Sequence, residues 1–316
     1  MTWFWAAGGY APMSERAGLL VHHAAIGDFL IALRLTECFA GVRWTVLSRS
    51  TLGRLAWSLG AAEAFEDFDA GDWYRLFGPD PRPNSSVVDF VAHFEIVLNV
   101  VAGPGETFSR NLDRLCRGCV HHVDPRLPEG FGGHCWQHLA GQIADCHTAA
   151  LPASAFGLRP ACIALAADSR DTVVIHPGAS SAAKRWPLAN FVRLADRLRQ
   201  EGMTPSFLLG EVEQEQFSSA EIESLRRSDT VMTGLDLPNA AAVLHRCRAY
   251  VGNDSGISHL AAAVGAPTIT VFTATNPRNW RPLGRAVHVI DTRASETTEA
   301  TLNRIVSIAA AVDRRG

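Results

Sequence analysis

The stretch VGNDSGISHLAAAVGAPTITVF, residues 251–272, predicts a strand, a turn of small residues, a helix and a second strand. Both ends are short apolar runs, which is typical of buried strands. The turn lies at residues 253–256, and the helix begins near Ile257. A strand–helix–strand unit of this kind indicates an α/β protein with a parallel, doubly wound sheet.

The same alternation extends over the rest of the chain. In the second half it predicts further strands at 172–175 and 206–209, and a helix near Pro238. Another helix has Leu188, Phe191, Leu194 and Leu198 on one face and ends at Gly202, where a C-cap glycine belongs. In the first half we expect strands at 18–22, 43–48 and 94–100, a helix after Gly27-Asp28, a loop at 78–86, and an element of unassigned type at 87–91.

The length of 316 residues favours two domains. Alanine and proline accumulate at 147–170 without an amphipathic period, so we interpret this segment as the linker. The predicted domains are 1–155 and 165–316, and the last helix is a candidate to pack back on the N-terminal domain.

Composition limits the class of protein. The net charge of −3 gives no reason to expect nucleic acid as a partner, and seven irregularly spaced cysteines favour a reducing compartment, hence the cytoplasm. No apolar run reaches the roughly 18 residues of a membrane span. The N-terminal segment does not resemble a signal peptide. Trp3, Phe4 and Trp5 could contact a membrane interface; a disordered extension before Met13 is the alternative.

Four loops at the carboxyl ends of predicted strands carry polar residues, which is where α/β sheets bind ligands. They are 24–28, 176–187, 253–259 and 273–277. A G-x-G-x-x-G motif after the first strand and a P-loop are both missing, which disfavours NAD enzymes and P-loop NTPases. The small residues at 252–256 would let backbone amides approach a diphosphate. A purely structural turn capped by Ser255 fits equally well. Lys184 would project from the same sheet edge and could neutralise a leaving diphosphate.

Three blocks of this sequence resemble the ADP-heptose:lipopolysaccharide heptosyltransferases of glycosyltransferase family 9. They are IGDFLIAL at 26–33, HPGASSAAKRWPLANFVRLADRL at 176–198 and the stretch 251–272. The resemblance covers 17–60 and 170–285 well, and 61–165 poorly. It implies the GT-B fold, with two facing Rossmann-like domains, and transfer of heptose from ADP-heptose in lipopolysaccharide core synthesis.

The resemblance also implies site residues. Asp28 matches the general base, and Lys184 matches the lysine on the donor phosphates. Among Glu211, Glu213 and Glu215 we favour Glu213 as the acidic residue that holds the donor ribose. The implied donor-binding set is Gly27, Ser180, Glu213, Asp254, Ser255, Gly256 and His259.

Two departures from the family pattern concern the substrates. Many members carry a basic residue between the first strand and the IGD motif, where this chain has His22, His23, Ala24 and Ala25. This departure puts a phosphorylated acceptor in question. The loop FTATNP at 272–277 stands in place of FGxTdP and leaves the donor sugar open.

The expected mechanism is a single displacement with inversion and without a metal. Asp28 opens a helix, whose dipole should keep the carboxylate ionised. An N-cap role for Asp28 is the structural alternative. Asp67-Phe68-Asp69 matches a D-x-D metal pattern that is frequent by chance. The cysteines and histidines of 116–147 could hold zinc or iron, whereas a packed helix with Trp136, Leu139 and Ile143 explains the segment without a metal.

The sequence therefore predicts an inverting, metal-independent glycosyltransferase with no cofactor. Its partners are a nucleotide-sugar donor, expected to be ADP-heptose, and a glycan or glycolipid acceptor; it binds no nucleic acid. The expected location is the cytoplasm, compatible with peripheral association at the inner membrane. Two alternatives stay open: a GT-B transferase using another NDP-sugar, and a non-catalytic nucleotide-sugar-binding or assembly protein of the same fold.

Overall fold

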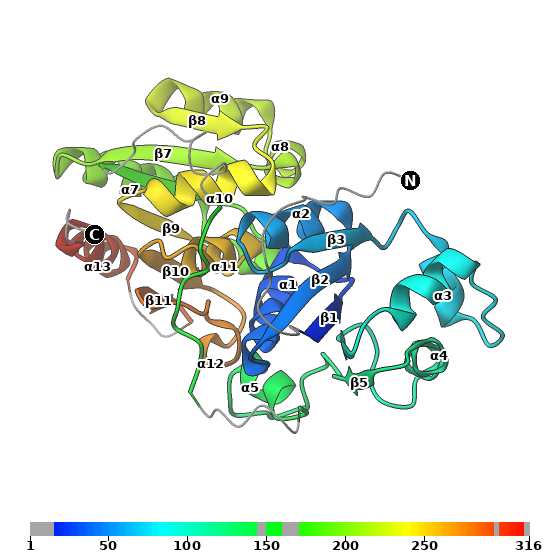
Figure 1. The fold of residues 1–316 in the computed structure, drawn as a ribbon. Coiled ribbons are helices and arrows are strands. Elements are labelled where there is room, and N and C mark those ends of the chain that lie inside the picture. The colour runs from blue at the N-terminus through cyan, green and yellow to red at the C-terminus, as the bar shows by residue number, and fades with distance from the viewer. Residues whose placement is uncertain (1–15, 144–149, 160–170, 294–296, 313–316) are drawn as a thin grey trace.

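The computed structural model describes residues 16–143, 150–159, 171–293 and 297–312, which form two parallel sheets flanked by helices (Figure 1). The first sheet has the order β3-β2-β1-β4-β5 and the second the order β11-β10-β9-β6-β7-β8. The strands of the first sheet are β1 (Arg16–Val21), β2 (Val42–Ser48), β3 (Ala64–Asp67), β4 (Ile96–Asn99) and β5 (Cys119–His122). Those of the second are β6 (Thr172–His176), β7 (Thr204–Leu209), β8 (Thr230–Thr233), β9 (Ala249–Asn253), β10 (Thr268–Phe272) and β11 (Val287–Asp291).

Helices connect successive strands, as parallel sheets require. In the first half they are α1 (Ile26–Leu33), η1 (Arg34–Cys38), α2 (Ser50–Ser58), η2 (Asp72–Phe77), α3 (Ser85–Ala92), α4 (Thr107–Leu115) and α5 (Cys135–Ala140). In the second they are η3 (Ala182–Lys184), α7 (Leu188–Gln200), α8 (Glu211–Gln216), α9 (Ser219–Ser228), α10 (Leu237–Arg246), α11 (Gly256–Ala263), α12 (Pro277–Trp280) and α13 (Thr298–Ala311).

The strand order reverses once in each sheet. In the first sheet the reversal lies between β1 and β4, and in the second between β6 and β9. The loops that leave neighbouring strands at a reversal diverge to opposite faces and open a crevice at the carboxyl edge, where doubly wound sheets bind ligands. The segments that follow β1, β6 and β9 carry Asp28, Lys184 and Asp254, respectively. The topology therefore places the predicted site residues at the two reversals.

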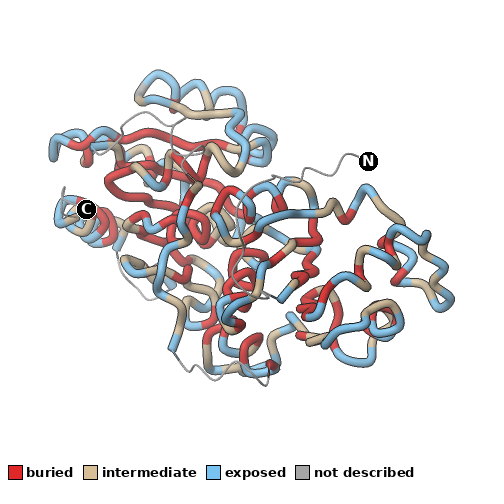
Figure 2. Tube along the Cα trace, viewed as in Figure 1, coloured by how far each residue is buried: buried red, intermediate tan, exposed pale blue. Residues whose placement is uncertain are grey.

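The two halves share one hydrophobic core. Helix α1 packs against α11, and α2 packs against α10. One continuous cluster of buried residues includes Leu20 and Phe29 from the first half together with Tyr250 and Leu260 from the second. Figure 2 shows buried chain in both sheets and in the helices between them. The carboxyl ends of the sheets are thus held facing each other by apolar burial, the dominant favourable term in folding.

Most of the expected elements are confirmed, with differences. Residues 87–91 lie in helix α3, and strands β3, β5, β8 and β11 were not expected. These four are the edge strands of the two sheets, and their residues are mostly half-buried or exposed, so their sequences lack a long apolar run. Gly202 follows α7 with a φ of +74°, a left-handed conformation that glycine adopts without strain.

The last helix packs on the C-terminal sheet, not back on the N-terminal half. Leu302, Ile305 and Ala309 of α13 join the core that contains β6, β7 and α7. Glu299 also forms ion pairs with Arg193 and Arg197 of α7. A helix from the same half already offers an apolar face for α13, which explains why the expectation was wrong.

Three findings bear on the expected location of the protein and on its membrane contact. Cys38 is disulfide-bonded, whereas Cys116, Cys119, Cys135 and Cys247 are free thiols, so the cysteine pattern does not imply a fully reduced chain. No helix within the described ranges is long and apolar enough to span a membrane. The proposed membrane contact at Trp3, Phe4 and Trp5 lies outside the described residues, as do both ends of the predicted linker.

Candidate functional site

The N-termini of α1 and α11 meet at two glycines. A Cβ atom on Gly256 would lie 2.8 Å from Cβ of Ile26, and one on Gly27 would lie 3.2 Å from the ring of His259. A contact under 3.0 Å forces neighbouring atoms to move, so Gly256 permits this approach directly. The IGD and NDSG segments of the two halves are therefore in van der Waals contact.

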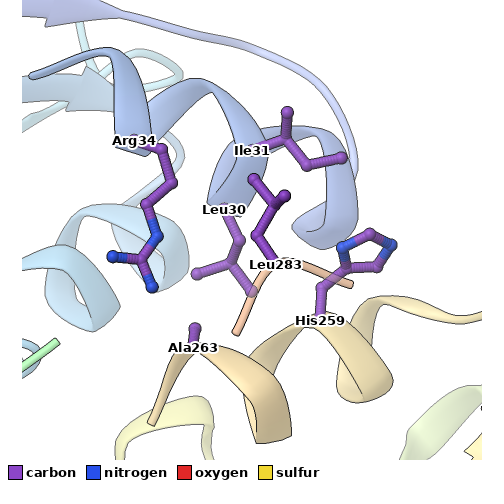
Figure 3. A pocket seen from close by; sticks show the side chains of 6 residues that line it. All are labelled: Leu30, Ile31, Arg34, His259, Ala263 and Leu283. Atoms are coloured by element: carbon purple, nitrogen blue, oxygen red, sulfur yellow. The ribbon is translucent and has the colours of Figure 1, made fainter. Parts of the chain in front are cut away.

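Beyond these turns, helices α1 and α11 pack closely against each other. Leu30, Ile31 and Arg34 face His259, Ala263 and Leu283 across a cavity of about 10 Å³ (Figure 3). That volume holds about one water molecule. The packed interface is thus too tight for a substrate.

Lys184 and Asp254 form an ion pair at this edge. Nζ of Lys184 lies 2.9 Å from Oδ2 of Asp254, and the hydroxyl of Thr275 donates to the same oxygen over 2.5 Å. Asp254 is buried, while the Lys184 side chain keeps 29% of its surface exposed. Sequence reasoning had given Lys184 and Asp254 separate roles on the donor. Thr275, which orients Asp254, was missed because a threonine in a loop carries no distinctive signal.

Asp28 lies in the first turn of α1, close enough to Lys184 and Asp254 for both charges to affect its pKa. Desolvation raises the pKa of Asp28; the nearby Lys184 opposes the rise and Asp254 adds to it. The N-cap of α1 is Ala25, without any side-chain cap bond, so the alternative role of Asp28 as a helix cap is wrong. The helix dipole was expected to favour the ionised carboxylate, whereas desolvation shifts the pKa of Asp28 in the opposite direction, although the residue stays open to solvent on one side.

Asn253, at the end of β9, contacts the loop after β6 in the C-terminal half. Its Nδ2 donates to the carbonyl of Pro177 over 2.8 Å and its Oδ1 accepts from the backbone N–H of Trp186 over 2.9 Å. Ser255 caps α11 by accepting from the N–H of Ser258, as the turn chemistry predicted. The buried amide of Asn253 therefore fixes both ends of the loop that carries Ser180 and Lys184. A single asparagine in the sequence does not indicate this structural role.

Glu213 is buried directly under the loop after β6. Its Oε2 accepts from the backbone N–H of Gly210 over 2.9 Å, and its Oε1 lies 3.8 Å from Nε2 of His176. A Cβ on Gly178 would come within 1.9 Å of Oε1, so only glycine fits there. Glu213 thus braces the loop, while Glu211 and Glu215 are exposed. Its predicted contact with a ribose stays a prediction.

Two buried histidines border the site from opposite halves. Burial lowers the pKa of His259 to about 4, with Asp254 opposing and His134 and Lys184 adding to the effect. Burial also lowers the pKa of His134 to about 4. His134 caps α5 and its Nε2–H donates to the carbonyl of Arg281 over 2.8 Å. Both rings are therefore neutral near pH 7.

The cysteine- and histidine-rich segment contains strand β5 and helix α5. Trp136 and Leu139 of α5 join the core shared by the two halves. Burial raises the pKa of the Cys135 thiol to about 12, so it stays protonated. Within the described part of the chain, no three His, Cys, Asp or Glu side chains are grouped to hold a metal ion, including the Asp67–Asp69 pattern. The segment's end, 144–147, lies outside the described residues.

Comparison with known proteins identifies the family. The family model described as glycosyltransferase family 9 (heptosyltransferase) matches residues 144–305, just over half of the chain. The chain belongs to glycosyltransferase family 9. The match contains Lys184 and the 253–256 turn, so it covers the part of the site that the C-terminal half contributes. It also confirms the family that the three sequence blocks indicated.

Named relatives agree with this family. Lipopolysaccharide heptosyltransferase 1 of Pseudomonas aeruginosa is 30% identical over 165 residues, or 51% of this chain and 46% of the relative. Lipooligosaccharide heptosyltransferase 2 of Haemophilus influenzae is 34% identical over 127 residues, or 38% of this chain and 36% of the relative. The alignments thus span less than half of these curated relatives.

Solved structures confirm the GT-B fold over almost the whole chain. The E. coli heptosyltransferase WaaC with ADP has a TM-score of 0.69 at 17% identity, covering 92% of this chain and 99% of that one. The E. coli ADP-heptose lps heptosyltransferase II has a TM-score of 0.68 at 16% identity, covering 93% and 98%. The resemblance in fold therefore extends well beyond the part of the chain that the sequence alignments cover.

Proposed function

We propose that this member of family 9 is an inverting glycosyltransferase that moves heptose, or a related sugar, from ADP-heptose to a hydroxyl of a lipopolysaccharide-type acceptor. The proposal rests on one observation: Asp28 of the first half lies in the field of the Lys184–Asp254 pair of the second. A candidate base and a candidate charge for the leaving group are thus brought together from facing domains. The names of the curated relatives and the structures solved with ADP support the choice of donor and acceptor.

In the proposed step, the acceptor oxygen forms a bond to the anomeric carbon as the bond from that carbon to the diphosphate oxygen breaks. Asp28 accepts the proton of the acceptor hydroxyl, and ADP leaves with the electron pair of the broken bond. Attack from the face opposite the diphosphate inverts the anomeric centre. The raised pKa of Asp28 suits this role because it brings the carboxylate closer to the basicity that proton transfer needs.

Lys184 provides positive charge for the departing diphosphate. An ammonium group has three N–H donors, and Asp254 takes one of them. The other two can face the phosphates, since the side chain is part exposed. The free amides at the N-terminus of α11 add to this stabilisation. In this scheme a lysine does what a divalent cation does in other transferases, so no metal is required.

The experiment is transfer with a donor panel. The full chain is incubated with heptose-free lipopolysaccharide and, separately, ADP-heptose, ADP-glucose or UDP-glucose, with and without EDTA. Product mass and released nucleotide are measured. We expect a heptose adduct from ADP-heptose that survives EDTA. Transfer from another nucleotide sugar alone would assign a different donor, and ADP binding without transfer to any acceptor would favour the non-catalytic alternative.

A further inference from the structure

The loop that follows β10, residues 273–277, contacts the turn that carries Lys184. The hydroxyl of Thr273 donates to the carbonyl of Ala183 over 2.7 Å. Ala183 is the middle residue of η3, and Lys184 is its last. Because the carbonyl of Ala183 belongs to the same planar peptide unit as the backbone nitrogen of Lys184, a hydrogen bond that fixes this carbonyl also fixes the start of the lysine.

The turn η3 has few contacts of its own to hold it in place. None of its three residues is buried, and its N-cap makes no side-chain hydrogen bond. Short 3₁₀ turns also have poorer hydrogen-bond geometry than α-helices. The side chain of Asn253 holds the surrounding loop at Pro177 and at Trp186, on either side of η3. The hydrogen bond from Thr273 therefore anchors the loop within the turn, next to the lysine.

A second threonine of the 273–277 loop holds the partner of Lys184. The hydroxyl of Thr275 donates to Oδ2 of Asp254 over 2.5 Å, and the same oxygen lies 2.9 Å from Nζ of Lys184. One loop thus fixes Lys184 in two ways. Thr273 acts on the backbone of the lysine turn, and Thr275 acts on the carboxylate that the ammonium group contacts.

The far end of this loop is fixed by the N-terminal half. The side chain of Asn276 caps α12 by accepting from the backbone N–H of Arg278. Asn279, buried in α12, donates through Nδ2 to the carbonyls of Phe131 over 2.9 Å and Gly133 over 2.7 Å. The 273–277 loop is therefore tethered at one end to β10 and at the other, through α12, to the facing half.

We propose that Thr273 is a positioning residue for the transfer reaction. Its hydroxyl holds the lysine turn on the tethered loop, so that the ammonium group of Lys184 meets the departing diphosphate without first reorganising. Charge that is oriented in advance stabilises a transition state without a cost of reorganisation at the moment of reaction. The inference rests on the proposed function, because it takes Lys184 as the charge that balances the leaving group.

Kinetics of the full chain test this role. Thr273→Val removes the hydroxyl and should lower kcat by about tenfold, the effect of one hydrogen bond, with little change in the donor KM. Thr273→Ser keeps the donor and should restore most of the rate. In a Lys184→Ala background the Thr273→Val change should cost less than about twofold, because Thr273 acts through the lysine. Thr292→Val is the matched control: its hydroxyl also donates to a carbonyl at the end of β10, that of Phe272, and its loss should leave kcat unchanged.

The position of Lys184 can also be measured without activity, because it is the only lysine in the sequence. Full-length protein labelled with ¹³C at lysine Cε gives one side-chain signal by NMR. Asp254→Asn, which removes the ion pair, supplies the reference for a released lysine. Thr273→Val should move the signal toward that reference, whereas Thr273→Ser and Thr292→Val should leave it at the wild-type position. Thr273→Ala replaces Thr273→Val if the melting temperature shows that valine unfolds the protein.

A lysine signal that stays at the wild-type position without the Thr273 hydroxyl would overturn the proposal. An equal loss of kcat with and without Lys184 would also overturn it, because Thr273 would then not act through the lysine. The same holds for an equal loss in Thr292→Val, which would show a general effect at this end of β10. A wild type that transfers no sugar contradicts the proposed function itself, while the lysine signal still decides whether Thr273 holds the turn.

Discussion

The ammonium group of Lys184 lies 2.9 Å from Oδ2 of Asp254, and both residues influence the pKa of Asp28 in the opposite domain. The two influences have opposite signs: the cation lowers the pKa of Asp28 and the anion raises it. Asp254 is itself held by the hydroxyl of Thr275. An ion pair of the C-terminal half therefore affects the pKa of a carboxyl group in the N-terminal half.

Asp28→Asn should reduce transfer by about a hundredfold or more, because an amide cannot take the acceptor's proton. The fold should persist, since Asp28 makes no cap bond. At pH 7 the melting temperature should stay the same or rise slightly: the folded state raises this pKa, so the ionised carboxylate costs stability that the neutral amide does not. Turnover, melting temperature and ADP affinity are the measurements. Turnover within about tenfold of wild type would place the base elsewhere.

Lys184→Ala should lower kcat by about a hundredfold while weakening ADP binding less, because its charge matters most as the diphosphate leaves. Lys184→Arg, which keeps the charge, should recover part of the rate. Steady-state kinetics with the donor varied separate kcat from KM. If only the donor KM rises and kcat is unchanged, the lysine binds ground and transition states equally.

The acidic limb of the pH–rate profile should move in opposite directions in two variants. In the wild type, activity should fall with decreasing pH as Asp28 protonates, at a pH above the ordinary 3.8. Lys184→Ala removes the effect that lowers this pKa, so its limb should shift to higher pH. Asp254→Asn removes an effect that raises it, so its limb should shift to lower pH. The profile of kcat/KM checks both, and identical limbs in all three proteins would exclude Asp28 as the titrating group.

Gly178→Ala should destabilise the protein by about 1–3 kcal/mol, because its Cβ would overlap Oε1 of Glu213 at 1.9 Å. The same substitution in a Glu213→Ala background should cost less, since the overlapping carboxylate is gone. Gly157→Ala is the matched control: its Cβ would have no atom within 4 Å. Urea unfolding of the four variants measures the coupling. An equal cost in both backgrounds would show that Glu213 does not brace this loop.

Much of the site was predictable from the order of residues. The turn at 253–256 and the cap at Ser255 follow from local chemistry, since small and hydroxyl residues fit a strand-to-helix turn. The resemblance to family 9 supplied Asp28 and Lys184 as partners in one reaction. Asn253, Thr275 and His134 were missed because each acts through a contact with a residue distant in sequence.

By itself, the sequence determined the α/β class, the buried central strands and the loops that carry chemistry, because these depend on periodicity and turn residues within short windows. Only the tertiary structure decided how those loops meet. The approach of Gly27 to His259, the direction of the shift in the Asp28 pKa and the hydrogen bond from Thr273 to Ala183 all join residues from separate segments. Desolvation and charge act through space, and local sequence patterns carry no information about the distances that set them.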